Sequence, residues 1–240
     1  MKKIILDLRG QLIKMNTQGF SAEWDKCYLD NTQLSIWPWT DLVSLVHRNC
    51  KHLIASGNSS MMEFGCGAGA NIPLFLQLGM KYFAVEGSPS IVKRLHLRFP
   101  ELVNQIVAGD FTLEVPFTSN FDLVVDRAAI THNSTDAIKR TLKNIYCLLN
   151  SGGIFIGVDW FSTRHSDYLG GEQANDEYTR TNYCEGQFIG VGNVHFSNEA
   201  HLRELFADFE ILVLDEKIIT EHQSGSQHIF SSWNIVVRKT

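Results

Sequence analysis

The segment of the chain best suited to chemistry is a glycine-rich loop with the letters E-F-G-C-G-A-G-A-N, residues 63–71. Glycine lets the backbone turn sharply, and it lets a ligand approach the main chain with no side chain in between. Glu86 follows Gly65 by 21 residues, close to the offset of ~20 at which an acid holds ribose hydroxyls in nucleotide-binding βαβ units. The spacing therefore predicts a cofactor with a ribose, held by the loop and by Glu86.

Two classes of cofactor fit this loop, because the letters also match G-x-G-x-x-A, a form of the dinucleotide fingerprint. Three features disfavour an NAD(P)-dependent oxidoreductase. Glu63 stands where dinucleotide folds have an apolar strand residue, and the third glycine falls at Gly69. The C-terminal strands resemble a reversed hairpin and not a second parallel mononucleotide half. Such an oxidoreductase would also need a catalytic Tyr/Lys or His partner, and the chain contains no Tyr-x-x-x-Lys string. The oxidoreductase remains an alternative.

The elements that must position these residues alternate regularly between strand and helix. Short apolar runs predict strands, and stretches with helical periodicity predict helices between them. The predicted strands are 59–64, 82–86, 103–108, 121–126 and 154–159, and the predicted helices are 73–79, 89–99 and 134–149. Such alternation is typical of a parallel sheet with crossover helices.

The two ends of the chain and one insert depart from this alternation. A helix is predicted at 38–54, and another at 199–207. Strands 209–214 and 229–237, joined by a polar loop at 221–227, predict an antiparallel hairpin. Residues 161–196 are polar and dotted with aromatic side chains, and so long a segment without periodicity is more often a functional cap than a plain connector.

On these residues the chain resembles a class I S-adenosylmethionine-dependent methyltransferase of the small-molecule type, from about residue 59 to 156. The resemblance implies an α/β, Rossmann-like, doubly wound fold. Its sheet has seven mostly parallel strands with an antiparallel C-terminal hairpin, and helices cover both faces. We expect one domain over 1–240, in which 1–56 is an N-terminal helical cap, 57–160 the cofactor core, 161–196 the substrate cap and 197–240 the C-terminal helix and strand pair.

The same resemblance implies which residues hold S-adenosylmethionine, whose product is S-adenosylhomocysteine. The loop at 63–71 receives the methionine end, the acid at 86 holds the ribose, the segment 109–111 meets adenine, and 122–127 faces the reacting centre. The implied cofactor-binding residues are Glu63, Gly65, Cys66, Gly67, Gly69, Asn71, Glu86, Gly87, Ser88, Asp110, Phe111, Asp126 and Arg127.

Candidates for the substrate side follow the later strands. His132, a few residues after strand 121–126, is a candidate general base, with a structural loop histidine as the alternative. Arg127 and Asp159 are the other catalytic candidates, and an ion pair is the plainer interpretation of Arg127. Candidate substrate-binding residues are Trp37, Trp160, His165 and His195.

Composition excludes several other classes of function. The net charge of −5 disfavours nucleic acid and anionic membranes as partners. Five cysteines without a C-x-x-C pair indicate reduced thiols and a cytoplasmic protein. The nine histidines show no ligand spacing, so no metal is expected.

The resulting prediction is a methyltransferase that moves a methyl group to an oxygen or nitrogen atom of a small molecule by in-line displacement. The fourth-motif letters D-R-A-A at 126–129 lack the Pro-Pro-aromatic string of enzymes that methylate nucleic-acid amines. A protein or peptide acceptor and a cofactor-binding protein without turnover remain alternatives, and the oligomeric state is left open.

Overall fold

The computed structural model describes residues 4–6, 12–14, 23–32, 34–223, 225 and 227–240. Its centre is a seven-stranded sheet with the order β11-β12-β7-β6-β3-β4-β5. The parallel strands are β3 (Ser60–Phe64), β4 (Lys81–Glu86), β5 (Ile106–Ala108), β6 (Phe121–Arg127) and β7 (Leu149–Phe161). The hairpin of β11 (Phe209–Thr220) and β12 (Ile229–Lys239) is antiparallel and joins the sheet at β7. The predicted fold class is confirmed.

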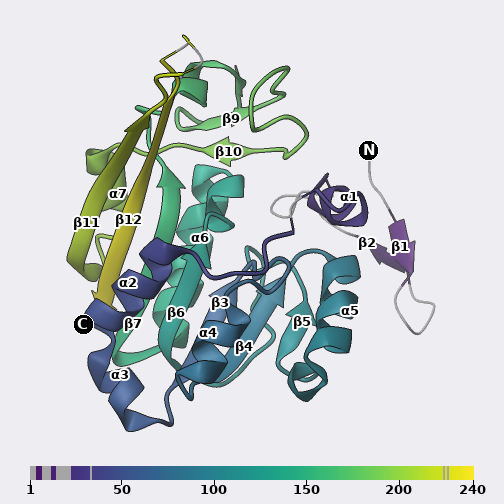
Figure 1. Cartoon of the computed structure of the whole chain (residues 1–240), viewed down its shortest axis with the longest axis vertical. Helices are drawn as coiled ribbons and strands as arrows, with labels where there is room; N and C mark the ends of the chain where they lie inside the picture. Colours follow the sequence, from purple (N-terminus) through teal and green to yellow (C-terminus); the bar gives the residue numbers. More distant parts are fainter. Residues whose placement is uncertain (1–3, 7–11, 15–22, 33, 224, 226) are drawn as a thin grey trace.

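Helices cover both faces of this sheet (Figure 1). On one face, apolar side chains of α2 (Thr40–Asn49), α4 (Ile72–Gln77) and α5 (Pro89–Arg98) pack against alternate strand residues such as Met61. On the other face, α6 (Thr135–Leu148) and α7 (Glu199–Leu205) pack against the intervening residues, such as Met62. Because side chains alternate along a strand, the near-continuous apolar runs supply both cores.

Four predicted elements differ in extent by more than two residues. The strand expected at 154–159 begins five residues earlier, as β7. The helix expected at 38–54 is divided into α2 and α3 (Lys51–Ser56), because Cys50 leaves the helical region with φ −113° and ψ 26°. The strand expected from 103 begins only at Ile106, after a short 3₁₀ turn, Pro100–Leu102. β11 runs to Thr220, six residues beyond the predicted end, because β12 pairs with it along that whole length. As an edge strand it tolerates the charges of Asp215 and Glu216, which a central strand would bury.

The predicted cap, 161–196, forms a small body of its own. It contains a 3₁₀ turn (Ser166–Leu169) and a three-stranded antiparallel sheet of β8 (Glu172–Gln173), β9 (Thr179–Thr181) and β10 (Val194–His195). Phe161, Phe188 and Phe196 form its apolar cluster. Figure 1 shows this body beyond the ends to which the parallel strands point.

The N-terminal part adds a strand pair, β1 (Ile4–Leu6) and β2 (Leu12–Lys14), and the helix α1 (Glu23–Leu29). Much of the segment predicted as a helical cap, 1–3, 7–11, 15–22 and 33, lies outside the described residues. Asp25 of α1 accepts hydrogen bonds from the hydroxyls of Ser88 and Ser90 at the start of α5. The described helices are each too short or too polar to cross a membrane.

Candidate functional site

A cavity of about 530 Å³ lies at the carboxyl ends of the parallel strands. Its walls come from the loop after β3, the ends of β4 and β5, the turn after β6, the end of β7, the cap and the segment around α1. In an open α/β sheet this is the place where ligands bind, because the chain reverses its strand order there. The cavity extends from β5 to β7, roughly 19 Å at about 4.8 Å per strand.

The glycine-rich loop lines this cavity through Gly65, Cys66 and Gly67. Gly65 has a φ of +65°, and a Cβ there would lie 2.2 Å from the Cβ of Ala129. The loop therefore packs directly against the turn after β6, at a distance that no other residue allows. Gly69 does not line the cavity; a Cβ there would meet Leu95 and Ile72, so its role in the structure is packing.

Glu86 ends β4 at the cavity wall and is 4% exposed. Its Oε2 accepts a hydrogen bond from the backbone N–H of Gly67 at 2.8 Å, and its Oε1 accepts one from the N–H of Ser88 at 2.9 Å. Burial raises the pKa of this carboxyl, although the amide donors oppose the shift. Each carboxylate oxygen retains acceptor capacity for a further hydrogen bond.

Glu63 lines the cavity, but both of its carboxylate oxygens already accept hydrogen bonds from other protein side chains. Its Oε1 accepts from Nδ2 of Asn71 at 2.7 Å, and its Oε2 accepts from the hydroxyl of Tyr82 at 2.5 Å. Burial raises the pKa of Glu63 to about 7. Asn71 lines the same wall, and its buried Oδ1 has no hydrogen-bond partner among the described residues.

The residues after β5 close the same half of the cavity. Asp110 and Phe111 both line it, with Gly109 and Thr112. The ring of Phe111 stacks on Phe64 with centroids 5.3 Å apart. Asp110 also accepts hydrogen bonds from the backbone N–H and the hydroxyl of Thr112. Of the other residues implied for the cofactor, Gly87 lines the cavity, whereas Ser88 is buried as the N-cap of α5.

Asp126 lies beneath the cavity floor and not among its lining residues. Its Oδ1 accepts from the backbone N–H groups of Ala129 and Ile130, each at 3.0 Å, and its Oδ2 accepts from Nε1 of Trp160 at 2.7 Å. Burial raises its pKa to about 7. The carboxylate shapes the turn after β6, and so positions the residues that follow.

His132 is carried to the cavity wall by that turn. Its Nδ1 lies 3.0 Å from the carbonyl oxygen of Asn193, and a carbonyl can only accept, so Nδ1 carries the proton. Burial lowers the pKa of His132 to about 4, so the ring is neutral at pH 7. Its Nε2, which then has a lone pair, has no hydrogen-bond partner among the described residues.

Arg127 lines the cavity within a network of charges. Its guanidinium lies 3.7 Å from the ring centroid of Trp39 and donates to Asp159 at 3.1 Å. Asp159 also accepts from Lys217 at 2.8 Å, and Lys217 reaches Asp41 of α2 at 2.7 Å. Asp159 itself does not line the cavity. The network ties the N-terminal segment to β7 and β11.

The four residues expected to bind substrate all lie outside the cavity lining. Trp37 is 75% exposed, because its side chain projects from the segment that leads into α2. Trp160 is fully buried, and it donates to Asp126 from inside the core. His195 is buried between Thr179 and His201, where it holds the cap together. His165 caps the 3₁₀ turn of the cap and contacts Gln187.

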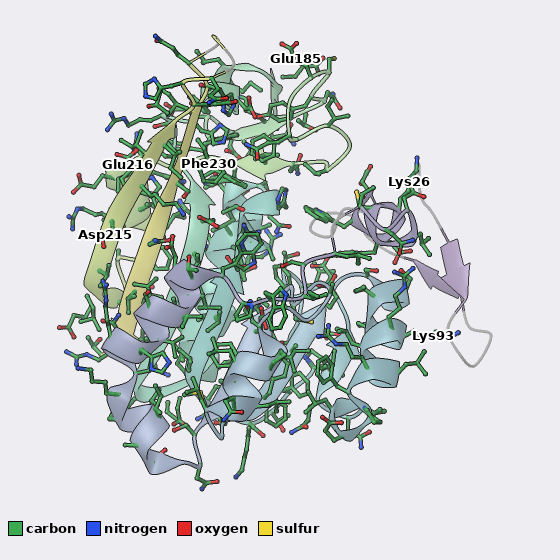
Figure 2. The ribbon with its side chains drawn as sticks, in the orientation of Figure 1. Lys26, Lys93, Glu185, Asp215, Glu216 and Phe230 are labelled. Carbon is green, nitrogen blue, oxygen red and sulfur yellow. The ribbon has the colours of Figure 1, made fainter. Side chains whose placement is uncertain are left out.

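Several lining residues were not among the predicted site residues. They come from segments far apart in sequence: Tyr28, Phe161, Gln187, Phe188, Val191 and Phe230. Phe161 ends β7, so the rule that ligands bind at carboxyl ends could have found it. Phe230, labelled in Figure 2 near the cap end of β12, comes from an antiparallel strand, for which no such rule exists.

A group of potential metal ligands also forms in the described part of the chain, from His165, Asp167 and His228. Its members are far apart in sequence, so spacing does not reveal it. Nδ1 of His165 accepts the backbone N–H of Asp167 at 3.1 Å, and Nε2 lies 2.7 Å from the amide of Gln187. Both ring nitrogens are thus occupied by the protein, and His165 offers no free lone pair to a cation.

Comparisons with known proteins agree with this geometry. Residues 62–157 match a family model described as a methyltransferase domain. No curated protein sequence matches the chain. A methyltransferase structure from Methanosarcina mazei has a TM-score of 0.62 at 17% identity, over 80% of this chain and 97% of the other. TehB from Haemophilus influenzae has a TM-score of 0.59 at 16% identity, over 90% and 67% of the two chains.

A third similar structure covers nearly the whole of both chains. It is 1,6-didemethyltoxoflavin-N1-methyltransferase from Burkholderia thailandensis, with a TM-score of 0.53 at 20% identity over 99% of each chain. That structure contains S-adenosylhomocysteine. Residues 62–157 of the present chain thus form a methyltransferase domain, and the whole chain has the fold of S-adenosylmethionine-dependent methyltransferases.

The residues present fit this cofactor. S-adenosylmethionine carries an ammonium, a sulfonium, two ribose hydroxyls and an adenine amine, all of which favour carboxylate or carbonyl oxygens. Among the described lining residues, the three acids Glu63, Glu86 and Asp110 all lie over β3, β4 and β5. Glu86 offers two oxygens to the ribose diol, and the buried Oδ1 of Asn71 is an unused acceptor at the same wall.

Proposed function

We propose that this chain is an S-adenosylmethionine-dependent methyltransferase that transfers the methyl group to an oxygen or nitrogen atom of a small molecule, by in-line displacement. The observation that carries the proposal is the covered half of the cavity over β6 and β7. The cap provides Gln187, Phe188 and Val191, and the N-terminal segment provides Trp24 and Trp39. Walls from two segments far apart in sequence enclose this half, which suits a small molecule that fits completely inside the cavity.

In this proposal, the residues at the ends of β3, β4 and β5 bind the cofactor. We expect Glu86 to accept both ribose hydroxyls, Asp110 and Phe111 to bind adenine, and the loop at Gly65–Gly67 to pass beside the methionine end. When bound, the cofactor supplies an electrophilic methyl group on a sulfonium. The residues around it align the acceptor and exclude water from the transfer.

His132 is the candidate general base in the acceptor half. The hydrogen bond from Nδ1 to Asn193 leaves Nε2 as a lone pair at the cavity wall. An acceptor O–H or N–H can donate to this nitrogen, and its proton can pass to Nε2 as the methyl group is transferred. Arg127 is a candidate for holding the acceptor, and Asp159 acts on it indirectly, by fixing the guanidinium.

The remaining parts of the proposal concern organisation and location. We propose one domain over 1–240 with the four parts predicted from the sequence, and a small molecule as its partner, not nucleic acid or membrane. The cytoplasm as location is supported by Cys27, Cys50, Cys66, Cys147 and Cys184, which are all free thiols.

One experiment tests the acceptor class. The purified chain is incubated with methyl-tritiated S-adenosylmethionine and, in separate reactions, with small-molecule, peptide and protein pools, and product is counted in each fraction. Label in the small-molecule fraction is the expected result. Label confined to peptide or protein contradicts the proposal, and tight cofactor binding with no label in any pool indicates a binding protein without turnover. Calorimetry with S-adenosylhomocysteine and NADH provides the control for the cofactor.

A further inference from the structure

The acceptor half of the cavity differs chemically from the cofactor half. Rings surround His132: Trp24 lies edge-on with its centroid 4.8 Å away, and Phe161 lies at 6.0 Å. Phe161 in turn contacts Phe188 at 4.8 Å and Phe230 at 6.5 Å. These four rings and the imidazole form one continuous wall, which we call the aromatic wall.

Charge is distributed just as unevenly. In the part of the chain that the structure describes, the lining carboxylates all belong to the cofactor half, and the one lining cation, Arg127, belongs to the acceptor half. Asp159, the acid paired with Arg127, is outside the lining and already bonded to Arg127, Lys217 and Ser232. An ammonium group in this half would lose its water without meeting a counter-charge.

Shape and hydrogen bonding further restrict which molecules can bind in the acceptor half. The guanidinium of Arg127 stacks on Trp39, so this side of the acceptor half is flat as well. The cavity of about 530 Å³ must hold the cofactor as well as the acceptor, so a small acceptor fits it best. His132 lines this space, and its Nε2 has no protein donor among the described residues, so the occupant must bring the donor.

We propose that the methyl acceptor is a planar aromatic molecule that carries its reacting O–H or N–H on the ring, and that this group donates its hydrogen bond to Nε2 of His132. The inference rests on the proposed function and names its substrate class. The lone pair of the acceptor oxygen or nitrogen forms the bond to the methyl carbon, the carbon–sulfur bond breaks, and sulfur keeps that electron pair. The acceptor proton moves to Nε2 and then to solvent.

Quaternary or primary amines are the competing occupants, because aromatic walls also attract cations. Two observations favour the neutral ring over the cation. Arg127 is close enough to His132 to lower the pKa of the imidazole further, and it would repel a second cation in the same way. A protonated amine, moreover, has no lone pair with which to accept a methyl group.

The test compares probe molecules that differ in whether they contain an aromatic ring and in which group donates the hydrogen bond. The full chain is used, with S-adenosylhomocysteine for binding and S-adenosylmethionine for methyl transfer. Binding is measured by quenching of tryptophan fluorescence with 7-hydroxycoumarin, 8-hydroxyquinoline, 2-naphthol and indazole, and with cyclohexanol, cyclohexylamine and choline as non-aromatic probes. Methyl transfer from the tritiated cofactor is measured on the same compounds. We expect the aromatic probes to bind at least ten times more tightly than the others, and label to enter one or more of them.

Variants show whether binding uses the aromatic wall. Phe188→Leu should weaken aromatic binding at least five-fold, whereas Ile189→Ala, a change at the exposed neighbouring residue, should leave it unchanged. His132→Asn keeps a donor for the Asn193 carbonyl but removes Nε2; we expect turnover to fall at least 100-fold with little change in cofactor affinity.

Three results would overturn the inference: no aromatic probe binds, an aliphatic amine is the best acceptor, or His132→Asn retains full turnover on an aromatic acceptor. The proposed function fails separately, when no small molecule of any kind accepts label although the cofactor binds. Methylation of aliphatic small molecules in preference to aromatic ones would therefore refute the aromatic class and leave the proposed function standing.

Discussion

The backbone N–H of Gly67 donates a hydrogen bond of 2.8 Å to Oε2 of Glu86. The glycine loop after β3 and the acid at the end of β4 are thus one unit, which forms because β3 and β4 are neighbours in the sheet. The bond holds the carboxylate of Glu86 at the cavity wall, where we propose that its remaining lone pairs accept the ribose hydroxyls.

Removing this carboxylate should weaken cofactor binding. Glu86→Ala removes both predicted ribose contacts and leaves the N–H groups of Gly67 and Ser88 without their acceptor. We expect a loss of about 1.5–3 kcal/mol in binding S-adenosylhomocysteine, measured by titration calorimetry. Glu101→Ala, a change at an exposed acid, is the matched control. An unchanged Kd in a folded Glu86→Ala variant would refute the ribose assignment.

Asp126 should contribute to stability and not to cofactor affinity. Asp126→Asn replaces one of its acceptor oxygens by an amide N–H, which leaves a buried N–H donor without an acceptor. The free energy of unfolding should fall by about 1–3 kcal/mol in urea titrations. Trp160→Phe should cost less in the Asp126→Asn background than alone, because the bond is already lost. A selective loss of cofactor affinity would instead support direct binding by Asp126.

His132 should make stability depend on pH. Burial lowers the pKa of folded His132 to about 4, below the ordinary histidine value of 6.5. Between these values the unfolded chain binds a proton that the folded chain does not, so the free energy of unfolding falls as the pH falls. His132→Asn should reduce the loss between pH 6.5 and 4.5 by about 2 kcal/mol, at about 1.4 kcal/mol per pH unit.

The pH dependence of the wild type must be compared with that of His132→Asn, because other buried groups titrate in the same pH range. His165 and His195 have lowered pKa values and act in the same direction as His132. Glu63 and Asp126 have pKa values raised to about 7, so they stabilise the folded chain as the pH falls towards their unfolded values. Identical pH slopes for wild type and His132→Asn would show that the imidazole is not buried as described.

The charge network beside the cavity should behave as a unit. Asp159→Asn leaves Arg127 and Lys217, whose side chains are 30% and 32% exposed, with one acceptor fewer. Water screens both cations, so we expect a loss of only about 1–2 kcal/mol in the free energy of unfolding. Lys217→Met should cost less in the Asp159→Asn background than alone; strictly additive losses would argue against the network.

Asp25 should control the N-terminal wall of the cavity. Asp25→Ala removes the acceptor for Ser88 and Ser90 that fastens α1 to α5. We expect faster tryptic cleavage after Lys26, which Figure 2 shows on α1. We also expect weaker cofactor binding, because Trp24 and Tyr28 would no longer be held at the cavity wall. Asp30→Ala, at an exposed acid of the same segment, is the control. Equal cleavage rates in the two variants would show that α1 is held by other contacts.

The sequence by itself determined the sheet and the cofactor half of the site. Alternating apolar runs and helical stretches specify a parallel sheet, and the loop 63–71, Glu86 and Asp110 follow three consecutive strands of its first half. Their relation is local, because parallel strands in sequence order deliver their carboxyl ends to one edge. The helix break at Cys50 and the extension of β11 to Thr220 were not predicted. Both depend on the elements that pack or pair with these segments in the folded chain.

Only the tertiary structure decided the acceptor half. Phe230 reaches it along an antiparallel strand, Phe188 from a cap without periodicity, and Trp24 from a helix more than 100 residues before His132. Tertiary packing also explains why four predicted residues do not line the cavity. Trp37 lies on the surface, Trp160 lies in the core, and His165 and His195 are buried within the cap. Residue type and spacing do not encode such placement; it follows from which distant surfaces bury one another when the chain folds.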